Sequence, residues 1–148
     1  MKTKIFLLSI LLFAFSCKSQ INTYSEETLK KQSEKITNFQ QQKRMSKTTK
    51  ITVGDILSKL DVPIISFGFE TETWESNSVN VIQLYFYTAK EFKYKMDNKI
   101  KFHDIYIYIK NPLPLQDVFL LKKKNQGKWT KEVNDYFKDM EVESVRAE

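Results

Sequence analysis

The stretch Val79-Asn80-Val81-Ile82-Gln83-Leu84-Tyr85-Phe86-Tyr87-Thr88 decides the fold that we expect of this chain. β-branched and aromatic side chains occupy both sets of alternating positions, and such residues are enriched in strands. Apolar residues on both faces are typical of a strand that is covered on each side. We therefore predict a central strand over residues 79–88, with the rest of the domain built around it.

Two segments on either side of this strand alternate between apolar and other side chains. The first, residues 65–72, places three apolar residues on one face: Ile65, Phe67 and Phe69. The second, residues 102–109, does the same with Ile105, Ile107 and Ile109. A period of two indicates a strand with one buried face. Both segments are therefore predicted to pair with the central strand.

The remaining β signals are shorter. Residues 92–96 alternate Phe92, Tyr94 and Met96 with lysines, and they predict a further strand that ends at the turn pair Asp97-Asn98. Residues 118–132, with Gly127 near their centre, predict a hairpin. Pro112 and Pro114 lack the N–H donor, so we expect a crossing loop or a sheet corner there.

Three helices are predicted. Thr52 and Asp55 have the spacing of a capping box, and they precede a short helix that Pro63 must end. Val133, Phe137 and Met140 indicate a short C-terminal helix, after which residues 143–148 are expected to fray. Thr23 and Glu26 form a second capping-box pattern, before a polar helix with a thin apolar stripe: Leu29, Ile36, Phe39 and Met45. We expect this last helix to dock weakly or to act as a spacer.

Together these elements predict an α+β fold. It comprises an N-terminal helical tether, a short helix, an antiparallel meander of about five or six strands, and a closing helix. A small β-barrel or sandwich, in which the sheet covers itself, is the alternative. The polar tract at residues 40–49 reads as a linker, so the domain boundary is placed near residue 50.

The first sixteen residues follow the order of a secretory signal. Lys2 and Lys4 precede an apolar run over residues 5–15, and the small residue Ser16 follows. The run is shorter than the roughly 20 residues that a membrane-spanning helix needs. We therefore predict a signal that is removed.

The stretch Ala14-Phe15-Ser16-Cys17 resembles the lipobox of bacterial lipoproteins, although Phe15 stands where a small residue is commonest. The resemblance implies cleavage between Ser16 and Cys17, lipid on Cys17, and an outer-membrane anchor that faces the periplasm, with surface exposure left open. The domains expected are then a signal peptide at 1–16, a lipidated tether at 17–50 and a globular domain at 51–148. The alternative is an ordinary signal peptide, which leaves the single cysteine of the chain as a thiol.

The charge of the chain is unevenly distributed. Residues 17–50 hold eight Lys or Arg against three Glu, whereas residues 51–148 hold fourteen Lys or Arg against fifteen Asp or Glu. A basic segment beside a lipid anchor is attracted to anionic head groups. The net charge of +6 therefore points to a membrane partner and not to a nucleic acid.

Few residues carry the signature of catalysis. His103 is the single histidine, so no histidine cluster for a metal is possible, and it is expected at the surface or at a strand edge. Its neighbour Asp104 points to the opposite face of a strand, which argues against an acid-base pair. Glu70 and Glu72 share a strand face and form the only candidate carboxylate pair, for catalysis or for binding a cation or a basic partner. We expect no cofactor, no metal and no enzymatic activity.

The tyrosines are the strongest binding signal. Tyr85 and Tyr87 share one strand face, Tyr106 and Tyr108 share another, and Tyr94 lies between them in sequence. On neighbouring strands they would form one amphipathic surface suited to a protein or a glycan, unless helices cover it. The function expected is a non-enzymatic envelope binding module that uses this face or the Glu70 and Glu72 strand. The alternatives are an inhibitor or immunity protein against an exported toxin or wall hydrolase, and a carboxylate-based hydrolase.

Overall fold

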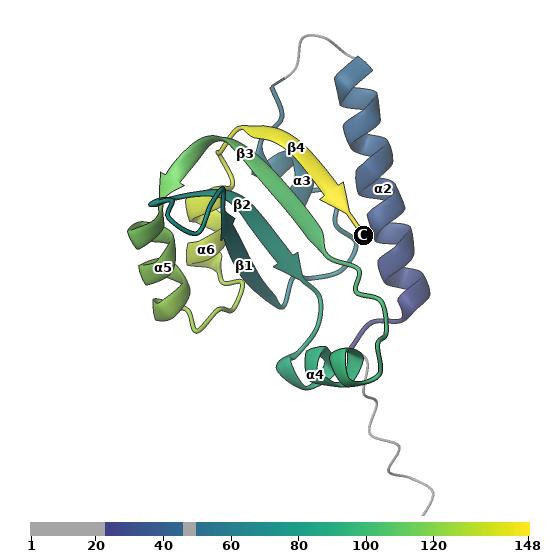
Figure 1. Ribbon diagram of the computed structural model, residues 1–148. Coiled ribbons are helices and arrows are strands. Elements are labelled where there is room, and N and C mark those ends of the chain that lie inside the picture. The colour runs from purple at the N-terminus through teal and green to yellow at the C-terminus, as the bar shows by residue number, and fades with distance from the viewer. Residues whose placement is uncertain (1–22, 46–49) are drawn as a thin grey trace, which may run out of the picture.

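The computed structural model describes residues 23–45 and 50–148 as an α+β fold (Figure 1). Its four strands form one antiparallel sheet in the order β1-β2-β3-β4. In chain order the elements are α2 (Glu26–Met45), α3 (Val53–Leu57), β1 (Ser66–Thr71), β2 (Ser78–Tyr85), α4 (Ala89–Asp97), β3 (Ile105–Pro114), α5 (Leu115–Lys124), α6 (Lys131–Phe137) and β4 (Val142–Ala147).

The register of the sheet separates its two faces. Phe67 pairs with Leu84, Leu84 with Ile105, and Ile105 with Ala147, so this row and the parallel row through Phe69, Ile82, Ile107 and Val145 lie on one face. Members of both rows pack in the hydrophobic core. The core therefore lies on one side of the sheet.

Four helices bury residues on this core face: α2, α3, α5 and α6. Figure 1 shows α3 and α6 behind the sheet and α2 beside β4. The prediction that strand 79–88 is covered on both sides is therefore wrong among the described elements, because the helices bury their apolar residues against one face.

α2 packs more closely than its sequence predicted. Leu29 and Ile36 are fully buried in the core, and the amide oxygen of Gln32 accepts hydrogen bonds from the backbone N–H groups of Asp61 and Val62. The expectation of a weakly docked spacer is corrected accordingly. The start of α2 also differs from the prediction. Ser25 Oγ accepts a hydrogen bond from the Thr28 N–H at 3.1 Å, in place of the capping box predicted for residues 23–26.

The sheet has four strands and not five or six, because two predicted β regions are helical. Residues 92–96 belong to α4, which begins with a capping box between Thr88 and Glu91. The hairpin predicted at residues 118–132 is instead α5, a turn and the start of α6, and Gly127 supplies a positive φ of 72° in that turn. The sheet is open, so the barrel and the sandwich are excluded.

The ends of the sheet supply two further corrections. β3 continues through both prolines to Pro114, which pairs with Ser78 beyond a register shift between Val79 and Val81. Residues 142–147 do not fray but form β4 along the edge of β3. The short helix with the Thr52 and Asp55 capping box and the helix at residues 131–137 are confirmed as α3 and α6.

Candidate binding face

The second face of the sheet carries the tyrosines. One row of register partners is Gly68, Gln83, Tyr106 and Arg146, and the next is Glu70, Val81, Tyr108 and Ser144. Tyr85 lies on the same face opposite Ser66. Among the described residues, none of these three tyrosines packs in the core, and each is half-buried. We call this surface the tyrosine face.

A chain of hydrogen bonds crosses β1 and β2 on the tyrosine face. The Tyr85 hydroxyl donates to Gln83 Oε1, and Gln83 Nε2 donates to Glu70 Oε1. Gly68 makes room for this chain of hydrogen bonds, because a Cβ at this position would lie 2.6 Å from the Tyr85 hydroxyl. Burial, together with the charge of Asp104, raises the pKa of Tyr85 to about 12, so its hydroxyl stays protonated and remains a donor.

Tyr106 is held from the edge strand. The Arg146 guanidinium lies 4.4 Å from the centre of its ring, which is a cation-π distance. The same guanidinium is 3.1 Å from the Glu148 carboxylate. Tyr106 and Arg146 therefore present an aromatic plane and a cation side by side.

Asp104 lies at the α4 end of the tyrosine face and is 5% exposed. Its Oδ1 is buried and has no hydrogen-bond partner among the described residues. Burial and the charge of Glu148 raise the pKa of Asp104 to about 7, although Lys95 opposes them. A carboxyl group without a partner at this depth is costly to ionise.

Compared with known protein families, curated proteins and solved structures, the chain matches none. The fold and the geometry of the tyrosine face therefore carry the functional reasoning.

The structure separates the other predicted residues from this face. Tyr87 lies past the end of β2 and is 4% exposed within the core, whereas Tyr94 is on α4. Glu70 joins the hydrogen-bond chain, but Glu72 lies beyond the end of β1 and is exposed. Ser16 and Cys17 lie outside the described residues.

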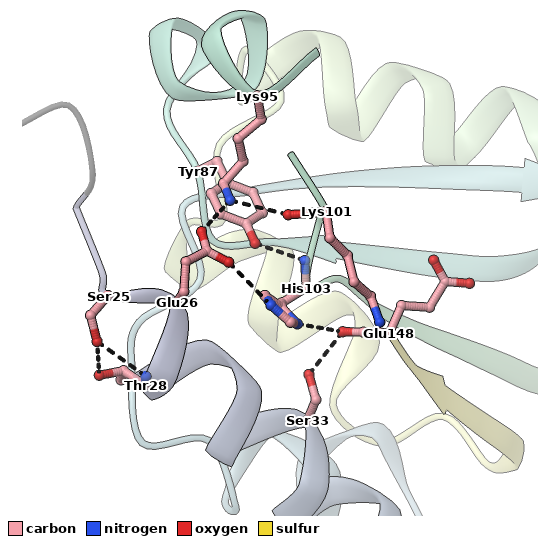
Figure 2. A network of polar contacts seen from close by, with 9 residues as sticks. All are labelled: Ser25, Glu26, Thr28, Ser33, Tyr87, Lys95, Lys101, His103 and Glu148. Atoms are coloured by element: carbon pink, nitrogen blue, oxygen red, sulfur yellow. Dashed lines mark hydrogen bonds and ion pairs between the residues drawn. The ribbon is translucent and has the colours of Figure 1, made fainter. Parts of the chain in front are cut away.

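A polar cluster at the start of α2 joins three distant segments (Figure 2). The Glu26 carboxylate pairs with the Lys95 ammonium and lies 3.2 Å from His103 Nε2. Lys95 also donates to the Lys101 carbonyl at 3.1 Å and lies 4.7 Å from the centre of the Tyr87 ring. The cluster therefore binds the start of α2 to α4 and to the segment before β3.

His103 belongs to this cluster and not to an exposed strand edge. Its ring Nδ1 lies 3.0 Å from the Glu148 carbonyl oxygen, which can only accept a hydrogen bond, so this nitrogen is the donor. The Tyr87 hydroxyl accepts the His103 backbone N–H at 2.7 Å. The His103 ring lies beside the Glu26 carboxylate and not beside its neighbour Asp104, and its side chain is 11% exposed.

Four residues of the face were not identified from the sequence: Gly68, Gln83, Asp104 and Arg146. Gly68, Gln83 and Asp104 sit at the same alternating positions as predicted tyrosines or glutamates, so parity along the strand could have identified them. Arg146 could not be found, because β4 itself was not predicted. Among residues 23–45 and 50–148, no group of three His, Cys, Asp or Glu could hold a metal ion, and no helix is long and apolar enough to cross a membrane.

Proposed function

We propose that this chain is a lipid-anchored protein of the cell envelope whose folded part binds a protein or an envelope polymer without catalysing a reaction. The binding role is supported most by the tyrosine face, which carries Tyr85, Tyr106 and Tyr108 on the side of the sheet away from the core. Tyrosine and arginine supply much of the binding energy in protein interfaces.

The side chains of this face are already held in place. Tyr85 and Gln83 are fixed by hydrogen bonds and Tyr106 by Arg146, so little side-chain freedom remains to be lost on binding. The surface is the face of an open sheet, and that shape favours a protein over a single sugar ring. A protein partner is therefore our first expectation, and an envelope glycan is the second.

The contacts of the glutamates favour binding over hydrolysis. Glu70 accepts a hydrogen bond from Gln83, and Glu72 lies outside the strand. A two-carboxylate hydrolase needs both groups to flank one bond of the substrate. Glu70 is better placed to orient Gln83 and, through it, Tyr85.

A pull-down tests the proposal. The tagged full-length chain is solubilised from membranes in detergent, and retained material is identified by mass spectrometry. The binding variant is Tyr106→Ala with Tyr108→Ala, and the matched control is Tyr94→Ala, which removes an exposed tyrosine from α4. Circular dichroism verifies that both variants fold.

We expect a partner that the wild type and Tyr94→Ala retain and the double variant loses. A toxin or a wall hydrolase as that partner would make the chain an inhibitor or immunity protein, which is the second candidate. Retention of the same partner by all three proteins would refute a role for the tyrosine face. The mass of the purified chain reports separately on cleavage before Cys17 and on its lipid.

A further inference from the structure

The helix α4 buries charged side chains and exposes apolar ones, which is the reverse of the usual arrangement. Its two most buried residues are charged: Glu91 is 2% exposed and Lys95 is 1% exposed, one helical turn apart. Its large apolar residues are exposed instead, with Met96 58% exposed and Phe92 43% exposed, although the Phe92 ring also packs against Phe102 at a centroid distance of 4.9 Å. Because helices of globular domains usually bury their apolar residues, this outward face requires an explanation.

The buried charges of α4 hold the start of the described chain. The Glu91 carboxylate accepts hydrogen bonds from the Thr23 N–H and, at 3.0 Å, from the Thr23 hydroxyl, while Lys95 pairs with Glu26. Thr23 lies six residues after Cys17 in the sequence. Six residues span at most about 20 Å. An anchor at Cys17 would therefore keep α4 within about that distance of the membrane.

The exposed charge on α4 and on the segment that follows it is mainly positive, although Glu26, which is 46% exposed and contacts α4 through Lys95, adds a negative group nearby. Four lysines are exposed on α4 and in the segment that follows it: Lys90, Lys93, Lys99 and Lys101. Asp97 is the only exposed acidic residue of the described segment 89–101, and it pairs with Lys93 at 3.2 Å. Phe92 also lines an apolar cavity of about 560 Å³ whose charged lining residues are Lys122 and Lys128. No acidic residue is among the described residues that line it.

We propose that the outer face of α4 lies on an anionic lipid bilayer, with Phe92 and Met96 at the level of the head groups and the surrounding lysines beside the phosphates. Apolar side chains among lysines on a helix surface are the composition of an interfacial helix. Anionic head groups complement the excess of lysine. The inference rests on the proposed anchor at Cys17, because that anchor brings α4 to the membrane.

Depth-dependent fluorescence quenching tests this contact. The lipidated full-length chain, in which the lipid blocks Cys17, carries Met96→Cys labelled with an environment-sensitive fluorophore. The matched control carries the same label at Asn111→Cys, an exposed position near the far end of β3. Both proteins are inserted into vesicles of phosphatidylcholine, with or without phosphatidylglycerol, that contain brominated lipids as quenchers.

We expect blue-shifted and quenched emission at position 96, an unquenched label at position 111, and weaker quenching at position 96 without phosphatidylglycerol. Equal quenching at both positions, or no quenching at position 96, would overturn the proposal. A label at position 96 that becomes shielded from water only when an envelope protein is added would also overturn it. The Tyr106→Ala and Tyr108→Ala variant should keep the quenching at position 96. Loss of the partner and loss of membrane contact are therefore separate results.

Discussion

Replacing Asp104 by asparagine should make the protein more stable at neutral pH. The folded state raises the pKa of this carboxyl from 3.8 to about 7, mainly through burial. The folded state therefore holds the proton more tightly than the unfolded state does. The free energy of unfolding then falls as the pH rises from about 4 to about 7. Above about pH 7 the stabilisation that protonated Asp104 contributes to the folded state is lost.

The size of the effect follows from the same pKa values. The difference between 3.8 and about 7 corresponds to about 4 kcal/mol, at about 1.4 kcal/mol for each pH interval of one. Asparagine has the same shape and does not ionise, so Asp104→Asn should remove this penalty. We expect the variant to exceed the wild type by a few kcal/mol at about pH 8 and to approach it at about pH 4.

Urea unfolding at several pH values, followed by the fluorescence of Trp129, measures the difference. Trp129 stacks on Phe137 in the core at a centroid distance of 6.0 Å, so its emission reports on global unfolding. A cost of burying the asparagine amide would lower the free energy of unfolding of the variant equally at every pH. It would therefore leave the difference in pH dependence between the two proteins unchanged. The same pH dependence in both proteins would refute the reasoning.

Three further substitutions test the packing. Gly68→Ala should lower the free energy of unfolding by about 1 to 3 kcal/mol, because its Cβ would displace the Tyr85 hydroxyl; urea midpoints measure this. Leu29→Ala should cost about 2 to 5 kcal/mol if α2 belongs to the core, and an unchanged midpoint would make α2 dispensable. Lys95→Ala should cost about 1 to 3 kcal/mol, because it removes the charged hydrogen bond to the Lys101 carbonyl, whereas the Glu26 carboxylate left behind is 46% exposed and stays solvated; an unchanged urea midpoint would contradict this.

The sequence predicted the elements whose patterns reflect local contacts. β1 and the first half of β3 follow from alternation on one buried face, β2 follows from its β-branched and aromatic residues although its expected cover on both faces is wrong, and α3 follows from its capping box. Tyr85, Tyr106 and Tyr108 were expected on one surface if their strands paired, and they do pair, whereas Tyr87, expected with them, is buried in the core. Strand alternation predicts a shared face because side chains point to opposite sides in turn.

The reversed amphipathicity of α4 explains the error at residues 92–96. The outward positions of Phe92, Tyr94 and Met96 imitate a strand with one apolar face. What α4 buries is Glu91 and Lys95, whose partners lie in the distant segment around Thr23 and Glu26. No local pattern of hydrophobicity reveals such a helix. The capping box at Thr88 and Glu91 was the one local signal for it.

β4 and α5 were missed for a different reason. β4 has few apolar residues, since only one side of it meets the core, and its pairing with β3 joins residues far apart in sequence. α5 buries Val118 and Leu121 at helical spacing, but Phe119 and Leu120 between them are half exposed and conceal that period. Pro114, read as a break, in fact directly precedes this helix.

The outer face of α4 and the tyrosine face have compatible orientations. α4 sits at the end of the sheet where β2 finishes and β3 begins (Figure 1). Tyr85 and Asp104 lie nearest to it, Tyr106 follows, and Tyr108 is about 13 Å beyond Asp104 along β3. If α4 lies on the bilayer, the strands extend away from the membrane surface, and the tyrosine face is accessible from the side. A partner could then reach Tyr106 and Tyr108 without displacing the anchor, so vesicle-bound and detergent-solubilised protein should bind the partner with similar affinity.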